Sequence, residues 1–495
     1  MNYRSTRDNT INISSMDAII KGISDEGGLF VPKSLPKFGN MEAFIGSPFS
    51  DIAYKVLSCF LTDYSEAELK FAVKNAYDDK FSSRDIVNIK KTNDAFFLEL
   101  FHGPTSAFKD IALQIMPHLL QIALRNKEIK EKIVILVATS GDTGKAALEG
   151  FKDIEGIEVV VLYPNKGVSD IQRAQMQTQT GDNLHVIAIN GNFDDAQNEV
   201  KNIFSDKKYN KELLDKGFRL SSANSINIGR LIPQITYYFY GYLKMLENGE
   251  IEKDEKINVV VPTGNFGNIL AAYYAKEMGL PVNHFICASN DNNVLTDFFN
   301  QGEYNRNREL LLTSSPSMDI LISSNLERFI YHILGEDERL VNQKMKELKE
   351  NGKYCMDKIS DELISGEYIN EKEVSFWIGK VYKEENYVMD PHTAVAYGAY
   401  QKYIQRTKDQ HKTLIASTAS PYKFPKKVLN SMGIKVPDND FLAMEVLEKN
   451  SLAKFPKKLR ELKELPIIHD IVVEKNDIKK TIEELLEGRN SCDSN

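Results

Sequence analysis

Short, continuously apolar runs alternate with amphipathic segments through much of the chain. The apolar runs are candidate strands and lie at 132–138, 159–163, 185–189, 258–262, 284–288 and 413–417. Segments of helical character follow several of them, at 145–151, 169–179, 194–204 and 269–278. This alternation predicts an α/β fold of mostly parallel sheets with helices on both faces. Parallel sheets bind ligands at the carboxyl ends of their strands, so we expect the chemistry in the loops after Ala138, Pro262 and Ser417.

Two parts of the chain lack this alternation. The first part, to about residue 95, carries helical stretches at 18–23 and 66–77 but no catalytic constellation. Residues 300–385 are charged, with helical runs at 343–350 and 357–363. We expect this second part to be an insertion or a peripheral helical layer.

Composition and charge exclude several classes of protein. Of the 495 residues, 42% are hydrophobic and 27% are charged, which excludes a disordered, collagenous or coiled-coil chain. The 62 Lys and Arg against 70 Asp and Glu give a net charge of −8, which argues against nucleic-acid binding. No apolar run reaches the ~20 residues of a membrane helix, no signal-peptide pattern opens the sequence, and the four cysteines and eight histidines show no metal-binding spacing. We therefore expect a cytoplasmic protein that binds no nucleic acid, membrane or metal.

A glycine-rich loop joins the predicted strand 258–262 to the predicted helix 269–278. Its residues are Thr263, Gly264, Asn265, Phe266, Gly267 and Asn268. Glycines let the backbone approach a ligand, and the free N–H groups of a helix N-terminus attract anions, so the loop is a candidate phosphate cradle or else a plain βα turn. Residues 190–194 repeat its Gly-Asn-Phe core, but Asp194 and Asp195 would repel phosphate there, and we interpret this copy as a helix cap.

A second glycine loop follows the strand 132–138. It carries Ser140, Gly141, Asp142 and Thr143. The loop is not a nucleotide-binding P-loop, because that motif requires glycine where Thr139 stands and a hydroxyl where Ala146 stands. It is either a site for a phosphate or carboxylate or a capped turn.

Three further segments carry candidate residues. Lys109 stands at the start of the apolar helix 111–124, where the helix dipole and apolar neighbours would lower its pKa and make it a nucleophile; otherwise it is a solvated surface lysine. The segment before the helix 231–246 offers Asn224, Ser225, Asn227 and Arg230, as helix caps or as phosphate ligands. The hydroxyl-rich end of the strand 413–417, with Thr418, is a ligand contact or an ordinary loop.

Taken together, these blocks resemble a known family. Segments 98–110, 138–144, 222–230, 262–268 and 417–426 occur in the order and spacing of the threonine synthases, which are pyridoxal-phosphate enzymes, in their long bacterial and fungal form. Segments 3–8, 25–32 and 390–397 also resemble that family's sequences, and the resemblance covers nearly the whole chain except 300–385 and the tail. It implies the type II fold of pyridoxal-phosphate enzymes, similar to the tryptophan synthase β chain, with an added N-terminal domain.

The resemblance also implies roles for the candidate residues. Lys109 would form the Schiff base with pyridoxal phosphate, and Thr418 would bind the pyridine nitrogen. Gly264, Asn265, Phe266 and Gly267 would hold the cofactor phosphate, with Asn268 as a further candidate. The loop of Ser140, Gly141, Asp142 and Thr143 would face the substrate or the 3′-oxygen of the ring. Asn224, Ser225, Asn227 and Arg230 would meet the substrate phosphate.

The implied organisation has three parts. Residues 1–97 would form an N-terminal domain, 98–130 and 231–495 the large cofactor domain with a helical insertion at 300–385, and 131–230 a small α/β domain. The implied reaction converts O-phospho-L-homoserine and water to L-threonine and phosphate, in a monomer or homodimer. The alternatives are a threonine or serine dehydratase or another lyase of this fold, a noncatalytic protein that binds a phosphorylated small molecule, and a nucleotide-binding α/β protein.

Overall fold

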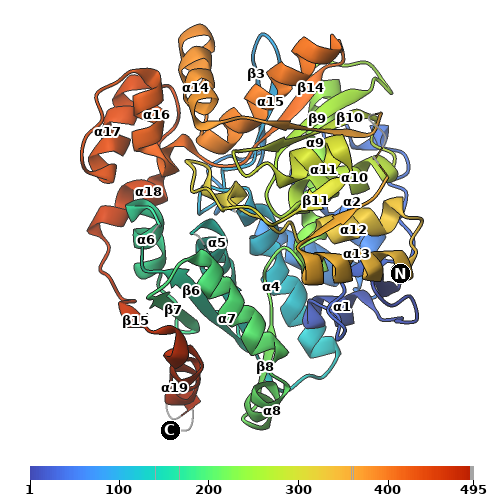
Figure 1. The fold of residues 1–495 in the computed structure, drawn as a ribbon, viewed down its shortest axis with the longest axis vertical. Helices are drawn as coiled ribbons and strands as arrows, with labels where there is room; N and C mark the ends of the chain where they lie inside the picture. Colours follow the sequence, from blue (N-terminus) through green and yellow to red (C-terminus); the bar gives the residue numbers. More distant parts are fainter. Residues whose placement is uncertain (78, 140, 167, 358, 360–361, 491–495) are drawn as a thin grey trace.

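Two β-sheets organise the chain, one in the upper and one in the lower half of Figure 1. The computed structural model describes residues 1–77, 79–139, 141–166, 168–357, 359 and 362–490. The six-stranded sheet has the order β13-β10-β9-β14-β4-β3, and only β3 and β4 are antiparallel. Its strands are β3 (Asn88–Lys91), β4 (Phe96–Glu99), β9 (Ile257–Pro262), β10 (Val282–Ser289), β13 (Ile364–Tyr368) and β14 (Thr413–Ser417).

The five-stranded sheet is parallel throughout and has the order β15-β7-β6-β5-β8. Its strands are β5 (Lys132–Ala138), β6 (Ile157–Pro164), β7 (Leu184–Ile189), β8 (Phe218–Ser221) and β15 (Ile471–Val473). Successive side chains of a strand point to opposite faces, and both faces are covered here. Ile133 and Ile135 pack into the large core that contains α4, whereas Val134 and Leu136 pack against the helices on the other face. Burial on both faces explains the continuous apolar runs, and all six predicted strands are confirmed.

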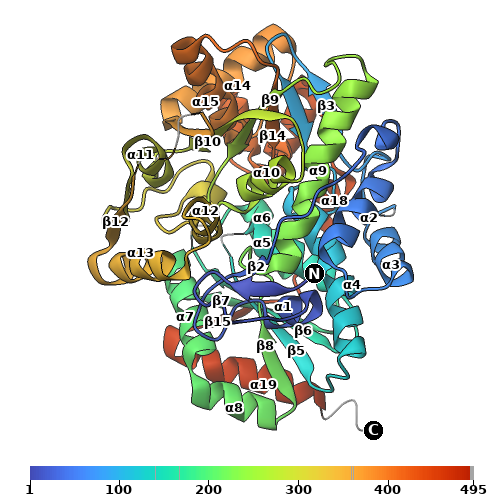
Figure 2. The same cartoon turned by 90° about the vertical axis from the view of Figure 1, so that its right-hand side faces the viewer.

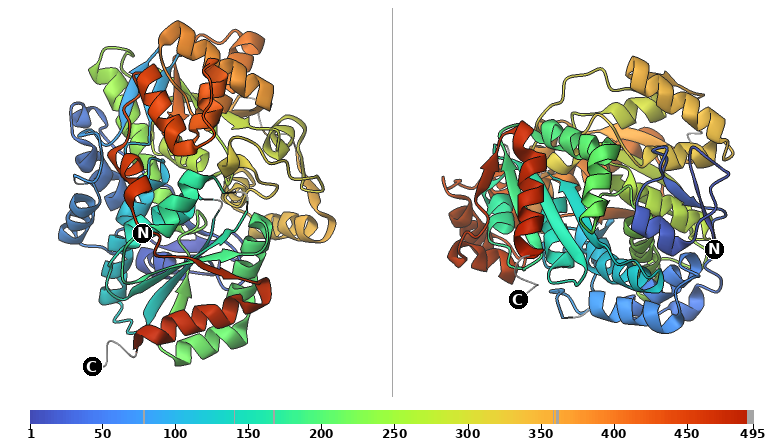
Figure 3. Two further views of the ribbon diagram at one scale, coloured as in Figure 1. Left: turned by 90° about the vertical axis from the view of Figure 1, so that its left-hand side faces the viewer. Right: turned by 90° about the horizontal axis from the view of Figure 1, so that it is seen from below.

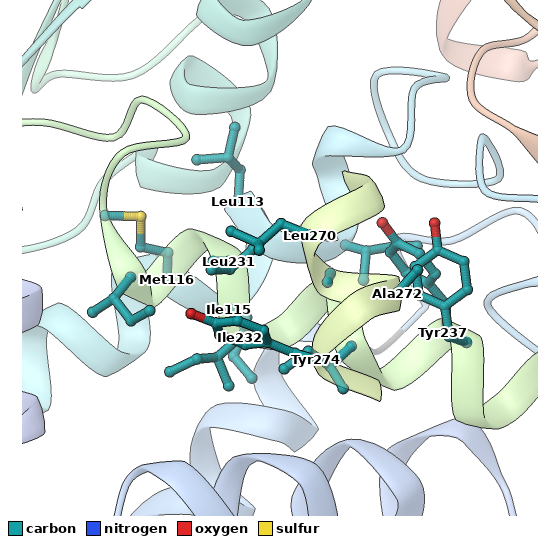
Figure 4. Close-up of a cluster of buried hydrophobic side chains, with 14 of the residues drawn as sticks. Leu113, Ile115, Met116, Leu231, Ile232, Tyr237, Leu270, Ala272 and Tyr274 are labelled. Atoms are coloured by element: carbon teal, nitrogen blue, oxygen red, sulfur yellow. The ribbon is translucent and has the colours of Figure 1, made fainter. Parts of the chain in front are cut away.

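Three helices form the apolar junction between the sheets. They are α4 (Lys109–Asn126), α9 (Ile228–Glu247) and α10 (Gly267–Glu277), and α9 packs against both of the others. Figure 4 shows side chains of α4 such as Leu113 and Met116 beside Leu231 of α9 and Leu270 of α10. The first residues of α4 and α10 therefore have fixed positions, because both helices are anchored in this core.

The other helices cover the two sheets. Around the five-stranded sheet lie α5 (Asp142–Phe151), α6 (Asp170–Gln177), α7 (Phe193–Ser205), α8 (Lys207–Asp215) and α19 (Ile478–Asn490). The remaining helices of the C-terminal half are α11 (Val294–Gln301), α12 (Leu326–Ile333), α13 (Glu338–Asn351), α14 (Glu371–Glu385), α15 (Pro391–Thr407), α16 (Pro425–Met432), α17 (Asp440–Asn450) and α18 (Lys457–Glu461). Within the described ranges, no helix combines the length and the apolar character needed to cross a bilayer.

The N-terminal segment packs on α4 and α9 (Figure 2). It contains the antiparallel pair β1 (Tyr3–Ser5) and β2 (Phe30–Pro32), and the helices α1 (Ser15–Lys21), α2 (Phe49–Phe60) and α3 (Glu66–Ala76). Ser65 and Glu68 form a reciprocal capping box that begins α3. Arg328 of α12 ties this segment to the rest of the chain, because its Nε donates to the carbonyl of Phe30 (2.9 Å).

Residues 300–385 are not only a helical layer. Helix α13 is present where the charged periodic run predicts one, but β13 follows as an edge strand parallel to β10. The second predicted run, 357–363, lies partly outside the described residues, and its described residues are not helical. The strand β13 has little apolar character, so its sequence gives a weak signal. Gly366 lets it approach α11, since a Cβ there would lie 2.5 Å from Thr296 Cα.

The pairing of the strands suggests changes to two of the predicted domain boundaries, and the division into domains remains a prediction. A boundary at residue 97 would cut through β4, and β3 and β4 both belong to the six-stranded sheet. At the other end of the chain, β15 pairs with β7, and Ile478 and Ile482 of α19 pack on the five-stranded sheet (Figure 3). We propose that the N-terminal unit ends before β3 and that residues 471–490 belong with the small domain.

Candidate active site

A cavity of about 370 Å³ lies where the loops after β5, β9 and β14 converge. It has the position predicted from the sequence, at the carboxyl ends of parallel strands. Each of the predicted cofactor residues lines it, namely Lys109, Gly264, Asn265, Phe266, Gly267, Asn268 and Thr418. Among the substrate candidates, Thr143, Asn224, Ser225 and Arg230 line it as well.

The loop between β9 and α10 has the geometry of an anion cradle. Phe266 adopts a left-handed conformation (φ 63°) and α10 begins directly after it without a side-chain cap, so its first N–H groups remain available. Ser323 Oγ donates to the carbonyl of Gly264 (2.7 Å), and the Asn325 amide and backbone N–H donate to the carbonyl of Asn265 (3.1 and 3.0 Å). These hydrogen bonds fix the orientation of the carbonyl groups of Gly264 and Asn265 in the loop. Gly264 is sterically required, because a Cβ would lie 2.5 Å from the Ser317 carbonyl.

Asn268 adds a side-chain donor to this cradle. Its Oδ1 accepts hydrogen bonds from the hydroxyls of Tyr237 (2.8 Å) and Tyr238. Its Nδ2 is buried and has no hydrogen-bond partner among the described residues. A buried donor without a partner is costly, so this atom indicates that an acceptor group binds in the cavity.

Lys109 begins α4, as predicted, and is 9% exposed. Its Nζ donates to Ser317 Oγ (3.0 Å) and lies 3.5 Å from Asp142 Oδ2. Burial lowers the pKa of Lys109 to about 8; the nearby Arg230 and Lys423 also lower it, while Asp142 opposes the shift. The direction of the pKa shift is the predicted one, and of the two causes expected from the sequence, the helix dipole and the apolar surroundings, burial among apolar surroundings is the main one.

Asp142 lies behind Lys109 rather than on the cavity wall. Lys423 Nζ is 2.6 Å from Asp142 Oδ1, and Gln172 Nε2 donates to the same oxygen (2.9 Å). Burial alone would raise the pKa of Asp142, but Lys423 and Lys109 outweigh it and hold the pKa well below its ordinary value. Asp142 is therefore a permanent anion that two lysines share.

Arg230 is a buried cation without a carboxylate partner among the described residues. It is 5% exposed, and its Nη1 donates to the carbonyl of Ala223 (2.9 Å). Burial lowers the pKa of Arg230 to about 10, so the group stays charged at neutral pH. Such a guanidinium on a cavity wall is suited to bind an anionic ligand.

Other substrate candidates have structural partners or lie outside the described residues. Asn227 caps α9 by accepting from the Gly229 N–H (2.9 Å), and its Nδ2 donates to two backbone carbonyls, so its amide does not reach the cavity. The N–H of Gly141 donates to Thr139 Oγ1 (2.9 Å), which turns it away from a ligand. Ser140 lies outside the described residues. The loop at 190–194 is a helix cap, as predicted, since Asn192 and Asp195 cap α7.

The residues that cover Lys109 were not among the candidate site residues predicted from the sequence. Ser317 lies over its amine and donates to Asp142 Oδ2 (3.3 Å). The Ser317 N–H in turn donates to Nε2 of His392 (3.3 Å), whose Nδ1 lies 2.6 Å from Asp390 Oδ2. With Nε2 as the acceptor for the Ser317 N–H, the ring hydrogen is placed on Nδ1, toward Asp390. The block 390–397 gave the only sequence signal for His392, and 417–426 the only one for Lys423.

A buried polar cluster fixes the segment that carries Ser317. Asp319 accepts hydrogen bonds from Asn290 Nδ2 (2.7 Å), Asn292 Nδ2 (3.0 Å) and Thr313 Oγ1 (2.8 Å). The cluster positions residues 313–319 over Lys109, so a region that looked peripheral in sequence forms one wall of the cavity. The described residues hold no group of three or more His, Cys, Asp or Glu side chains placed to bind a metal ion.

Known proteins resemble the chain along nearly its whole length. The family model described as pyridoxal-phosphate dependent enzyme matches residues 87–418, and the models for the threonine synthase N terminus and C-terminal region match 2–77 and 393–482. The threonine synthase of Schizosaccharomyces pombe is 38% identical over 464 residues, which span 86% of this chain and 88% of that protein. The chain belongs to the threonine synthase family of pyridoxal-phosphate-dependent enzymes. The resemblance seen in the sequence is confirmed.

Two further members of the threonine synthase family extend the comparison. Threonine synthase-like 1 of Homo sapiens is 37% identical over 484 residues, which span 94% of this chain and 63% of that protein. The crystal structure of the pyridoxal-phosphate-bound threonine synthase from Brucella melitensis superposes with a TM-score of 0.85 at 32% identity, over 98% of this chain and 99% of that one. This agreement confirms the predicted type II fold.

The cofactor of the threonine synthase family fits the residues present. Pyridoxal phosphate offers a phosphate, an aldehyde and a pyridine nitrogen. The uncapped start of α10 and the unpartnered Asn268 Nδ2 suit the phosphate, and the buried amine of Lys109 suits the aldehyde. The hydroxyl of Thr418, at the end of β14, is available for the ring nitrogen.

Proposed function

We propose that the chain converts O-phospho-L-homoserine and water to L-threonine and phosphate, as a cytoplasmic monomer or homodimer. One observation carries the choice of substrate: Arg230 presents a buried cation, without a carboxylate partner in the described part of the chain, in the same cavity as the α10 cradle and close enough to Lys109 to lower its pKa. The cradle suits the phosphate of the cofactor. Arg230, with Asn224 and Ser225 beside it on the wall, suits a second phosphate on the substrate.

The residues divide the work of the reaction as follows. The bound cofactor supplies electron withdrawal from the substrate's Cα. Lys109, neutral in a large fraction of molecules near its pKa of about 8, takes the proton from Cα and then serves as the base that takes a proton from Cβ, so that the phosphate can leave Cγ. Arg230 stabilises the negative charge of the departing phosphate. After the phosphate has left Cγ, this carbon takes up a proton, water adds its hydroxyl at Cβ, and Cα regains a proton, which gives the methyl group and the hydroxyl of threonine.

The surrounding residues orient these groups. Gly264, Asn265, Phe266, Gly267 and Asn268 hold the cofactor phosphate, and Thr418 contacts the ring nitrogen. Because Thr418 offers a neutral hydroxyl, it does not enforce a positive charge on the ring as a carboxylate would. Thr143 faces the substrate from the first turn of α5.

The proposal is tested by product analysis. The purified protein, supplemented with pyridoxal phosphate, is incubated with O-phospho-L-homoserine, and threonine and phosphate are quantified together. Equal release of both supports the proposal. Phosphate with a keto acid in place of threonine contradicts the hydration step. Ammonia release from threonine, without activity on O-phospho-L-homoserine, indicates the dehydratase, and binding of O-phospho-L-homoserine by a protein that takes up no cofactor indicates a noncatalytic relative.

A further inference from the structure

A buried lysine outside the predicted site contacts the partner of Lys109. Lys423 lies in the short turn Pro421–Lys423 that follows β14, and its side chain is 0% exposed. Its Nζ is 2.6 Å from Asp142 Oδ1 and donates to the carbonyl of Thr105 (3.2 Å). The other oxygen of Asp142 faces Lys109 (3.5 Å). Each carboxylate oxygen therefore serves one lysine.

This contact joins segments that follow strands of both sheets, behind Lys109 and outside the cavity wall. Asp142 begins α5 after β5 of the five-stranded sheet, whereas Lys423 follows β14 of the six-stranded sheet. Burying an ion pair removes two charges from water, and its attraction often does no more than offset that loss. Stability alone is thus a weak reason for a fully buried pair next to the reactive amine.

We propose that Lys423 is a positioning residue that acts through Asp142: it holds one carboxylate oxygen so that the other faces Lys109 as a weakened counterion. The inference rests on the proposed function for its role in catalysis. Without Lys423, Lys109 would be the one cationic partner of Asp142 left among the described residues, and Asp142 would hold a proton on Nζ more strongly. Lys423 thereby keeps the amine available as a base.

The charges around Lys109 determine whether removal of Lys423 raises or lowers the pKa of Lys109. Asp142 on α5 favours the protonated amine, whereas Arg230 on α9 and Lys423 disfavour it. Ser317 faces Nζ with a neutral hydroxyl, and Asp110, the next residue of α4, is engaged by Thr105 through its N–H (2.8 Å) and hydroxyl (2.6 Å). Removing Lys423 deletes one disfavouring charge and frees Asp142, so both changes raise the pH at which Nζ loses its proton.

The test compares Lys423→Met with Asp142→Asn in the holoenzyme. Protonation at Lys109 Nζ is followed through the visible absorbance of the bound cofactor as a function of pH, together with the pH profile of kcat/KM. We expect the titration midpoint to rise by about one pH unit or more in Lys423→Met, the size typical of a close charge, and to fall in Asp142→Asn. General structural damage would not move the midpoint in opposite directions.

Two further variants complete the design. Lys426→Gln removes a neighbouring exposed lysine that pairs with Asp440 (2.8 Å), and its midpoint should stay at the wild-type value. In the Asp142→Asn background, Lys423→Met should shift the midpoint by less than half as much as in the wild type. An unchanged midpoint in Lys423→Met, or an equal shift in both backgrounds, would overturn the proposal.

Two outcomes distinguish the positioning role of Lys423 from a purely structural role and from failure of the proposed function. If neither Lys423→Met nor Lys423→Gln folds, the pair is a structural requirement and the positioning role is refuted. If the wild type binds the cofactor on Lys109 but forms no threonine, the proposed function fails. The absorbance titration still decides the role of Lys423 in that case, because it requires no turnover.

Discussion

Replacing Arg230 by methionine should impair the reaction while leaving the folded protein as stable or more so. Arg230 is 5% exposed, bonds only the carbonyl of Ala223 among the described residues, and faces no carboxylate there. Burial lowers its pKa to about 10, and the difference from its ordinary value corresponds to about 3 kcal/mol. Methionine removes that cost and leaves the Ala223 carbonyl without its donor, which costs about 1 kcal/mol. We expect a net gain of about 1–2 kcal/mol in unfolding free energy.

The loss of function should be large. Hydrogen bonds from a charged donor contribute about 1.5–3 kcal/mol, so kcat/KM for O-phospho-L-homoserine should fall about 10- to 150-fold. Arg230 titrates well above neutral pH, so the stability difference between wild type and Arg230→Met should be constant between about pH 6 and 8. Steady-state kinetics and thermal denaturation of the same preparations measure the two effects.

Arg328 provides a matched contrast. It is also a buried arginine with its pKa lowered to about 10 by burial, but its guanidinium bonds Phe30, Ile226 and Asn325 (2.9, 2.5 and 2.5 Å). Arg328→Met should therefore destabilise the protein, because three acceptors lose their donor. A loss of stability in Arg230→Met with kcat/KM within twofold of the wild type would refute the reasoning and make Arg230 a structural tie.

Four other changes probe the remaining site. Lys109→Ala should abolish threonine formation, and near-normal turnover would contradict the assignment of the catalytic amine. Asn268→Asp keeps the side-chain shape but places a carboxylate beside the cradle, so the Kd for pyridoxal phosphate, measured by absorbance titration, should rise at least about tenfold. Gly264→Val should lower kcat/KM and thermal stability together, since its Cβ would meet the Ser317 carbonyl at 2.5 Å; wild-type values in both assays would show that the segment moves freely. Burial lowers the pKa of Lys109 to about 8. The rate at which Lys109 reacts with added pyridoxal phosphate should therefore rise about tenfold per pH unit below about pH 8 and level off above it. A rate that does not change with pH below about pH 8 would contradict a buried, titrating amine.

The sequence predicted those parts of the fold whose local pattern is strong. Six buried parallel strands appear as apolar runs, and the glycine loop after β9 is recognisable from Gly264 and Gly267, whereas the left-handed conformation of Phe266 is not predictable from its residue type. The strands β13 and β15 gave weaker signals, because β13 has few apolar residues and β15 has only three residues. Their positions depend on neighbours that are distant in sequence.

The residues of the cavity also divide into those with a local sequence signal and those placed by contacts distant in sequence. Lys109, Asn268 and Arg230 belong to strand–loop–helix junctions, and the sequence placed them correctly at the cavity. Ser317 contacts Lys109 across 208 positions of the chain, and no local pattern reports such a contact. Asn227 shows the opposite case, since its sequence position fits both a cap and a ligand, and only its bonds to Gly229 and to backbone carbonyls distinguish the two.

The late return of the chain to the five-stranded sheet affects how this protein is made. Strand β7 is complete once residue 189 is synthesised, yet one of its edges is paired only by Ile471–Val473, and its apolar residues Ile187 and Ile189 are covered partly by α19. A nascent chain therefore leaves this edge of β7 unpaired until residues 471–473 have left the ribosome, and such edges promote aggregation. Truncation before residue 471 would make that exposure permanent.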